Sequence, residues 1–207
     1  MARYCSTWSR PTEPPREAAL PGGSPQYDVP VRFELVQRLH APIEAVEEAL
    51  TDPRFLETLG TLPKLGRPKL LERRDDGNRV FQRVRYDFEG NLSPAVKAVV
   101  DPSKLSWVEE STQDRTTHRT AITIVPDNYT SIFGCSGSAR LTTDAPTGDT
   151  VRITTGDVSV RVPFVSGRAE SAIISGLQEH AVLEEEALNG WVKARRNAGH
   201  APDSPAE

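Results

Sequence analysis

The chain has 207 residues, a hydrophobic content of 37% and a net charge of −4. This length suffices for one domain with a hydrophobic core, and the lack of a basic block argues against a nucleic-acid partner. No apolar run approaches the ~18 residues of a membrane-spanning helix, and the first thirty residues lack the apolar segment of a secretory signal.

Residues 1–29 are rich in proline, serine, arginine and glutamate. Such a segment cannot bury enough apolar surface to offset its ordering entropy, so we expect a disordered N-terminal tail that is dispensable for folding. Residues 30–197 are expected to form one domain and residues 198–207 a second short tail. Cys5 lies in the first tail, far from Cys135. This separation disfavours a structural disulfide and fits a cytoplasmic protein.

A half-buried strand is predicted at 31–39, where apolar and polar residues alternate and Gln37 is a polar residue in the apolar phase. Pro42 suits the first position of a helix. Asp52 and Pro53 open a second helix, as N-cap and first residue. Two short helices are therefore expected directly after the first strand.

Further strands follow, beginning with a hairpin whose turn is Asp75-Asp76-Gly77-Asn78. Ser93 and Pro94 begin a short helical run that ends at Val100. The six strands of this part are predicted at 68–74, 79–89, 105–113, 116–125, 130–142 and 151–164.

The last of these strands changes phase along its length. Val151 and Ile153 are apolar at odd positions, whereas the apolar residues from Val158 to Phe164 are at even positions. A period of two cannot keep both sets on one face without an extra residue. The pattern therefore predicts a β-bulge near Gly156-Asp157.

One long helix is predicted from Ser166, a suitable N-cap, to Asn197. Glu170 falls in its first turn, where the helix dipole favours an acid. Its apolar stripe, at steps of three or four, comprises Ala169, Ile173, Leu177, His180, Leu183, Ala187 and Trp191. A long helix with a narrow stripe, placed after a run of strands, predicts an α+β fold in which the helix lies across a curved antiparallel sheet.

This order of elements resembles the START-like, or SRPBCC, superfamily, whose helix-grip fold is that of the birch-pollen allergen, polyketide cyclases and lipid-transfer domains. The residues that carry the resemblance are Ala41-Pro42, Val46, Ala49 to Pro53, the run 93–100, Trp107 and 162–167. The last three features are similar to an uncharacterised bacterial branch, a domain of unknown function. Glu47 departs from the pattern, because the superfamily usually has there an aromatic that helps to seal the base of the pocket.

The resemblance implies a cavity between the concave sheet and the C-terminal helix, binding a hydrophobic small molecule or lipid. Each candidate lining residue has the alternative of simply filling a core. The candidates are Phe33, Leu35, Gln82, Val84, Tyr86, Phe88, Trp107, His118, Ile122, Ile173, Gly176, Leu177, His180 and Leu183.

Other chemistry is weakly supported by the sequence. His180 and Glu184 have chelating spacing but lack a third ligand, and Cys135 lacks a nucleophile signature, so no metal, cofactor or catalytic residue is expected. The run Glu184-Glu185-Glu186 is interpreted as a solvated face. Because the inward phases are almost wholly apolar, binding is favoured over a cyclase, aromatase or dehydratase, which needs converging acid and base groups. A structural or regulatory protein with a filled core is the third alternative.

Overall fold

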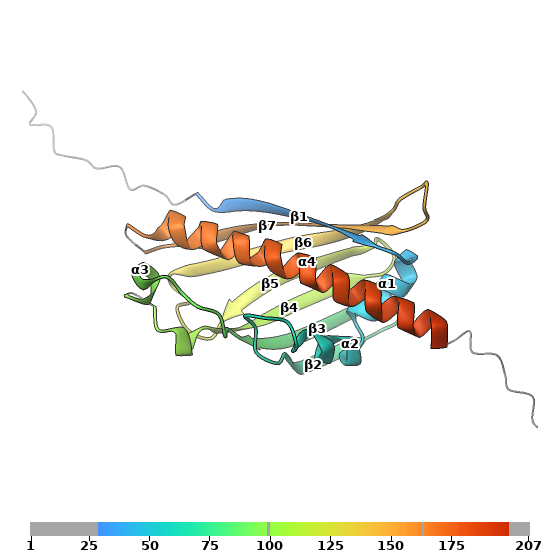
Figure 1. The fold of residues 1–207 in the computed structure, drawn as a ribbon, viewed down its shortest axis with the longest axis horizontal. Helices are drawn as coiled ribbons and strands as arrows, with labels where there is room; N and C mark the ends of the chain where they lie inside the picture. Colours follow the sequence, from blue (N-terminus) through green and yellow to red (C-terminus); the bar gives the residue numbers. More distant parts are fainter. Residues whose placement is uncertain (1–28, 99, 163, 199–207) are drawn as a thin grey trace, which may run out of the picture.

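The computed structural model describes residues 29–98, 100–162 and 164–198. Seven antiparallel strands form one curved sheet in the order β1-β7-β6-β5-β4-β3-β2, and the long helix α4 lies across it (Figure 1). The predicted α+β helix-grip architecture, with two short helices after the first strand, is confirmed. The tails predicted at 1–29 and 198–207 fall almost entirely outside the described residues.

The strands are β1 (Val31–Leu39), β2 (Lys69–Asp75), β3 (Arg79–Asp87), β4 (Ser106–Asp114), β5 (Arg119–Pro126), β6 (Phe133–Thr143) and β7 (Thr150–Val160). The helices are α1 (Ile43–Leu50), α2 (Pro53–Leu59), α3 (Pro94–Lys97), the 3-10 helix η1 (Pro102–Lys104) and α4 (Ser166–Ala198). Asp52 caps α2 as predicted, its Oδ1 accepting from Arg54 N at 2.9 Å. Pro42, by contrast, is the N-cap of α1 rather than its first residue.

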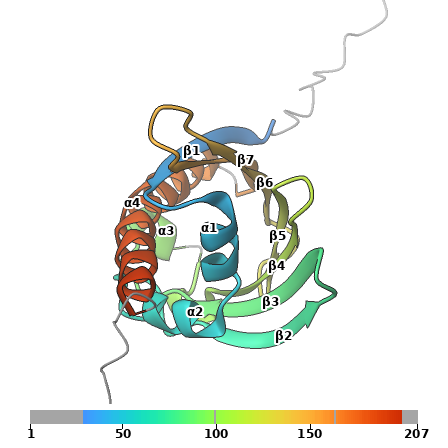
Figure 2. The same ribbon diagram turned by 90° about the vertical axis from the view of Figure 1, so that its right-hand side faces the viewer.

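The densest packing lies at one end of the domain, where α1 and α2 occupy the space between the sheet and α4. Figure 2 shows α1 inside the ring that the sheet and α4 form. Burying each of the larger apolar side chains here contributes ~1.5–3 kcal/mol. The buried cluster comprises Leu39, Ala41, Ile43, Val46, Ala49, Phe55, Leu59, Leu141, Leu188 and Val192.

The predicted bulge near Gly156-Asp157 is wrong. β7 pairs with β1 in one continuous register, from Val31 opposite Val158 to Leu39 opposite Thr150. Its pairing with β6 is also continuous. The even-numbered residues of β7 therefore face the concave side throughout, including Arg152, whereas Val151 and Ile153 face the convex side. The phase change arises because polar side chains occupy the inner positions, and the register shift recorded in the sheet lies in β2, between Leu70 and Glu72.

Four predicted strands are shorter in the structure, those at 79–89, 116–125, 130–142 and 151–164. β7 ends at Val160, whereas Phe164 is fully exposed with a φ of 67°, a left-handed conformation that no strand accommodates. β5 begins at Arg119, because His118, also left-handed with a φ of 55°, belongs to the preceding turn. Glu170, predicted to complement the helix dipole, is buried, and its Oε1 accepts from Val160 N at 2.8 Å.

The long helix agrees with its predicted bounds, but its buried face does not follow the apolar stripe. The buried residues of α4 are Glu170, Ala181, Leu188 and Val192. Glu184 also lies on this side, in contact with Arg152 of the sheet. The prediction that the acidic run 184–186 forms a solvated face is therefore wrong for Glu184, because hydrophobic periodicity cannot detect an acid that is buried by an ion pair. Among the described helices, none is long and apolar enough to span a membrane.

Candidate ligand-binding site

Several apolar side chains that face each other between the concave sheet and α4 are only half-buried. Strand alternation and the strand register turn Leu35, Trp107 and Ile122 toward α4, yet all three are only half-buried. Ile173 and Leu177 of α4 are half-buried as well. An inward-facing side chain that remains partly accessible is not completely covered by its neighbours, whereas close packing would bury it fully.

The structure distributes the sequence-predicted residues over several places. Phe33, Leu35, Val84, Tyr86, Trp107 and Ile122 lie in the inner rows of the sheet. Ile173, Leu177, His180 and Leu183 are half-buried on α4. Phe88 lies beyond the end of β3, bridged to Leu65.

Gln82 and His118 lie instead at the α1–α2 end. Gln82 is buried, with Nε2 3.5 Å from Thr51 O. His118 Nδ1 is 3.1 Å from Oε1 of the buried Glu47. Glu47 stands where the superfamily usually has an aromatic. At this end of the domain a polar contact between Glu47 and His118 therefore takes the place of an aromatic ring.

Gly176 lies on α4 between Ile173 and His180. A Cβ added to it would meet no atom within 4 Å, apart from the local helix backbone and chain neighbours. The glycine is therefore not required for close packing of the helix on the sheet.

Three charged or polar side chains form a network across the interior, and only Gln37 among them was predicted to face inward. Arg152 Nη1 donates to Glu184 Oε2 at 3.0 Å and to Gln37 Oε1 at 3.2 Å. Gln37 Nε2 donates to Glu184 Oε2 at 3.1 Å and to Ala181 O at 2.8 Å. The network links β1, β7 and α4.

The network also sets the charge of Glu184. Burial by itself would raise the pKa of Glu184, but the positive charge of Arg152, together with hydrogen bonds from Gln37 and Arg152, holds that pKa below its usual value. Glu184 is therefore ionised at neutral pH.

Glu109 is a second interior acid, in the same inner row as Trp107. Burial, together with the negative charge of Glu184, raises the pKa of Glu109 to about 7, with Arg152 acting in the opposite direction. No hydrogen bond or ion pair within the described part of the chain involves its carboxyl group. Glu109 therefore exchanges its proton near neutral pH, a property that suits general acid–base chemistry as well as ligand binding.

Tyr86 adjoins Glu109 across the strand pair. Its ring stacks on that of Trp107, with centroids 5.8 Å apart and planes 19° apart. Burial, followed by the negative charges of Glu109 and Glu184, raises the pKa of Tyr86 well above its usual value. The side chain is 8% exposed, and its hydroxyl makes no hydrogen bond to another described residue. Tyr86 is thus a neutral, unpartnered donor beside Glu109.

Two buried nitrogen atoms in this region also lack a partner within the described residues, Arg152 Nε and His180 Nδ1. A buried polar group without a hydrogen bond costs ~1–3 kcal/mol. A polar ligand atom or a water would recover that cost. Among the described residues, no group of three or more histidine, cysteine, aspartate or glutamate side chains is arranged to hold a metal ion.

Cys135 faces the same interior, opposite Val158 of β7. Burial, followed by the negative charges of Glu109 and Asp157, raises the pKa of Cys135 to about 11. The thiol therefore stays protonated at neutral pH and is a poor nucleophile.

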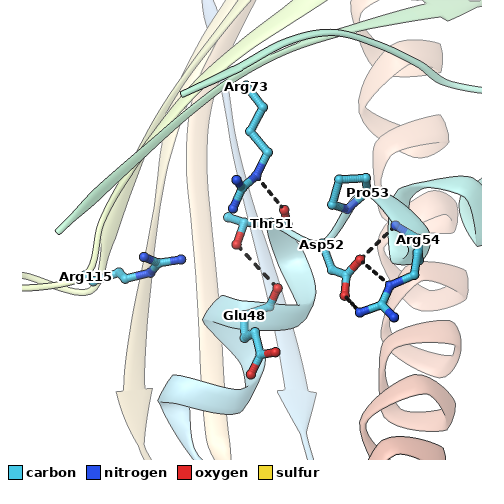
Figure 3. A pocket seen from close by; sticks show the side chains of 7 residues that line it. All are labelled: Glu48, Thr51, Asp52, Pro53, Arg54, Arg73 and Arg115. Atoms are coloured by element: carbon cyan, nitrogen blue, oxygen red, sulfur yellow. Dashed lines mark hydrogen bonds and ion pairs between the residues drawn. The ribbon is translucent and has the colours of Figure 1, made fainter. Parts of the chain in front are cut away.

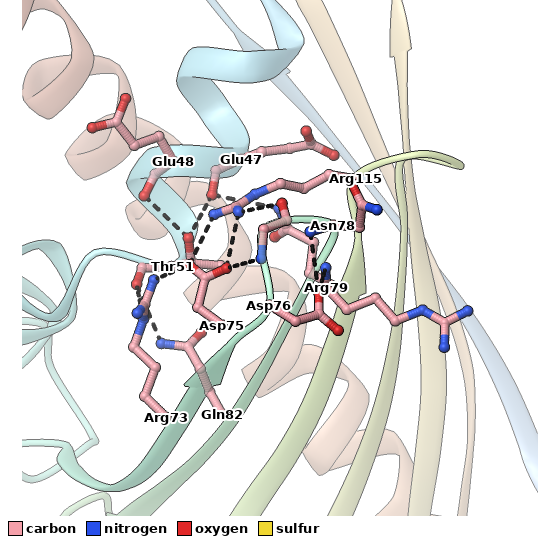
Figure 4. Close-up of polar contacts among 12 residues, drawn as sticks. Glu47, Glu48, Thr51, Arg73, Asp75, Asp76, Asn78, Arg79, Gln82 and Arg115 are labelled. Atoms are coloured by element: carbon pink, nitrogen blue, oxygen red, sulfur yellow. Dashed lines mark hydrogen bonds and ion pairs between the residues drawn. The ribbon is translucent and has the colours of Figure 1, made fainter.

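A surface hollow of about 400 Å³ lies outside this interior, between the α1–α2 junction and the β2–β3 hairpin (Figure 3). Arg73 Nε donates to Thr51 O at 3.2 Å, and its Nη2 donates to Asp75 Oδ2 at 2.8 Å. Arg115 Nη1 donates to Gly77 O at 2.9 Å and also pairs with Asp75 (Figure 4). These guanidinium groups are already engaged, so they hold the β2–β3 hairpin and its neighbouring turn against the end of α1 rather than offering free donors to a ligand.

The sequence carried signals for two of the acids and bases that its analysis missed. Glu109 shares the phase of Trp107, which was predicted to face inward. Arg152 shares the phase of Val158 and therefore faces inward. Its direction was missed because only apolar residues were taken to mark the inner face. Glu184 has no comparable signal, since only contact with Arg152 shows which way it points.

Comparison with solved structures identifies the class of fold. The Zhui aromatase/cyclase from Streptomyces sp. R1128 matches with a TM-score of 0.60 and 17% identity, over 84% of this chain and 99% of that one. A protein from Thermus thermophilus matches with a TM-score of 0.59 and 18% identity, over 80% and 99%. A norcoclaurine synthase from Thalictrum matches with a TM-score of 0.55 and 14% identity, over 81% and 97%. The protein therefore has the START-like helix-grip fold.

The sequence places the chain within one family of that class. Residues 34–192 match the model described as "Protein of unknown function (DUF2505)". The chain belongs to the DUF2505 family. No curated protein sequence matches it.

Proposed function

We propose that the protein binds a hydrophobic small molecule or lipid between the concave sheet and α4. The observation that carries the proposal is the partial exposure of inward-facing apolar side chains on both walls, such as Leu35 and Ile122 on the sheet and Leu177 on the helix. An apolar ligand would bury that surface, at about 25 cal/mol per Å². The fold shared with an aromatase/cyclase supports the proposal.

The interior also contains groups for a polar end of the ligand. Glu109, Tyr86 and Arg152 Nε offer an exchangeable carboxyl group, a hydroxyl and an N–H that no described residue engages. Small-molecule sites typically combine apolar walls with a few such polar groups that fix orientation. The preferred ligand is thus amphipathic, with a long apolar part.

The test is binding of the neutral fluorescent probe N-phenyl-1-naphthylamine. Ile122→Trp should fill part of the space, weaken probe binding and leave the free energy of unfolding nearly unchanged. Thr123→Trp is the matched control, because its side chain faces the convex side and probe binding should persist. If the parent protein does not bind the probe and Ile122→Trp unfolds readily, the interior is a filled core and the proposal is wrong. If the parent protein does bind the probe, native mass spectrometry of protein purified from its source would identify a retained ligand.

A second candidate function is an acid–base enzyme of the cyclase, aromatase or dehydratase type. The specific observation in its favour is Glu109, whose pKa of about 7 suits proton transfer at neutral pH. Deuterium exchange at the α-carbons of a long-chain methyl ketone, followed by NMR, tests this chemistry. Catalysed exchange that is lost in Glu109→Gln and kept in Glu110→Gln would support the enzyme. If the ketone binds but its deuterium exchange proceeds at the uncatalysed rate, the enzyme hypothesis is wrong and only the binding function remains.

A further inference from the structure

The charges around Glu109 do not balance. Of the groups that act on one another here, β4 and α4 contribute two carboxyl groups, Glu109 and Glu184, whereas β7 contributes one guanidinium group, Arg152. Arg152 is engaged by Glu184 at 3.0 Å. Glu109 forms no salt bridge with any described residue, and the Arg152 charge that favours its ionised form is already paired with Glu184. An isolated carboxylate in a low-dielectric interior is costly unless a cation joins it.

The surroundings of Glu109 favour a cation over an anion. Trp107 lies two residues away in the same inner row, and Tyr86 lies diagonally across the strand pair, within the roughly 7–8 Å of diagonal neighbours. Aromatic faces attract cations through their quadrupoles. An anionic group would instead meet Glu109 and Glu184, with Arg152 already paired.

We propose that the ligand of this interior carries a cationic group, such as a protonated amine, which binds between the Glu109 carboxylate and the Tyr86–Trp107 pair. This inference rests on the proposed function and adds the ligand class. The apolar part of the ligand lies along the half-buried inner row that includes Ile122 and Leu35. Recognition by a lone carboxylate selects an amine over an alcohol or a carboxylate of equal chain length.

The protonation of Glu109 links this binding to pH. The charged and titratable groups that face it are Glu184 and His180 on α4, Arg152 on β7, Tyr86 on β3 and Cys135 on β6. Below its pKa of about 7, Glu109 is neutral and attracts a cation less. Amine binding therefore releases a proton near neutral pH and strengthens as the pH rises.

The experiment is displacement of bound N-phenyl-1-naphthylamine by dodecylamine, dodecanol and dodecanoate at about pH 8, above the Glu109 pKa of about 7. Dodecylamine should bind at least about tenfold more tightly than dodecanol, and dodecanoate most weakly. Glu109→Gln should remove the amine preference. Glu110→Gln should keep it, because Glu110 pairs with Arg83 on the convex face at 2.9 Å.

The outcomes separate the two proposals. If no compound displaces the probe because the probe itself does not bind, the proposed function fails. If dodecylamine and dodecanol bind equally, or dodecanoate binds best, the protein is a ligand binder and the cationic ligand is excluded. Should Glu109→Gln fail to fold, the parent protein still decides the matter. Its preference for dodecylamine must fall several-fold between about pH 8 and pH 6, across the Glu109 pKa of about 7, and a constant preference would overturn the inference.

Discussion

The two halves of α4 lie in different environments, although they belong to one continuous helix. Near its C-terminus, Leu188 and Val192 are buried against α1, α2 and the sheet. Nearer its N-terminus, Ile173 and Leu177 are only half-buried. The difference follows from the short helices, which fill the space between sheet and helix at one end only. Half of α4 is thus part of a core, and half is the wall of a candidate binding site.

Several polar groups differ in the same way, although the buried Trp191 Nε1 at the packed end also lacks a hydrogen-bond partner among the described residues. At the packed end, Thr51 Oγ1 donates to Glu47 O at 2.9 Å, and Glu47 Oε1 pairs with His118. At the open end, the Glu109 carboxyl and the Tyr86 hydroxyl make no hydrogen bond to another described residue. Satisfied polar groups stabilise a fold. Unsatisfied ones, placed beside unfilled space, are what a site for a polar ligand requires.

Leucine truncation on α4 gives the largest contrast between the two halves. Leu188→Ala should lower the free energy of unfolding by ~2–5 kcal/mol, because it leaves a cavity in the packed end. Leu177→Ala should cost less than ~1 kcal/mol, because its side chain already borders unfilled space. Urea unfolding of both variants measures the difference. Equal losses would show that the interior is packed along the whole helix.

Breaking the interior ion pair should have the next largest effect. Arg152→Met leaves Glu184 without its counter-charge, so unfolding should become easier by ~3 kcal/mol. Adding Glu184→Gln to the same chain should restore much of that loss, because neither charge then remains. Thermal and urea denaturation of the single and double variants test this. A double variant no more stable than Arg152→Met would mean that the network acts through its geometry rather than its charge.

The raised pKa of Glu109 should make the free energy of unfolding fall as the pH rises. Its pKa rises from 4.5 in the unfolded chain to about 7 in the folded one. Between these values the folded state binds the additional proton, so the stability from this group is complete below about pH 4.5 and lost as the pH rises through 7. The loss is on the order of 3 kcal/mol. Urea unfolding of the parent relative to Glu109→Gln should show it, and parallel pH profiles would contradict it.

Gly176→Leu is expected to change stability least. A side chain there meets no atom at its Cβ within 4 Å, and leucine is a better helix former than glycine by ~1 kcal/mol. The free energy of unfolding should therefore hold or rise slightly, while binding of N-phenyl-1-naphthylamine falls if the side chain enters the site. Destabilisation by ~1–3 kcal/mol would instead indicate overpacking of a filled core.

Local sequence rules predicted most of the fold. The Asp52-Pro53 helix start, the hairpin turn at 75–78 and the span of α4 follow from capping, turn chemistry and periodicity, which act over a few residues. The resemblance to the START-like superfamily then predicted how these elements assemble. Errors fell where tertiary pairing overrides a local pattern, as in β7, whose continuous register excludes the expected bulge.

The sequence by itself determined the order of elements, the long C-terminal helix and the inward direction of several apolar residues such as Trp107 and Ile122. Only the tertiary structure decided that the charged residues Glu109, Arg152 and Glu184 lie inside. Arg152 and Glu184 come from distant elements, and neither would be stable in the interior without the other. Such charges carry no hydrophobic periodicity, so their direction follows from pairing across space rather than from their neighbours in the chain.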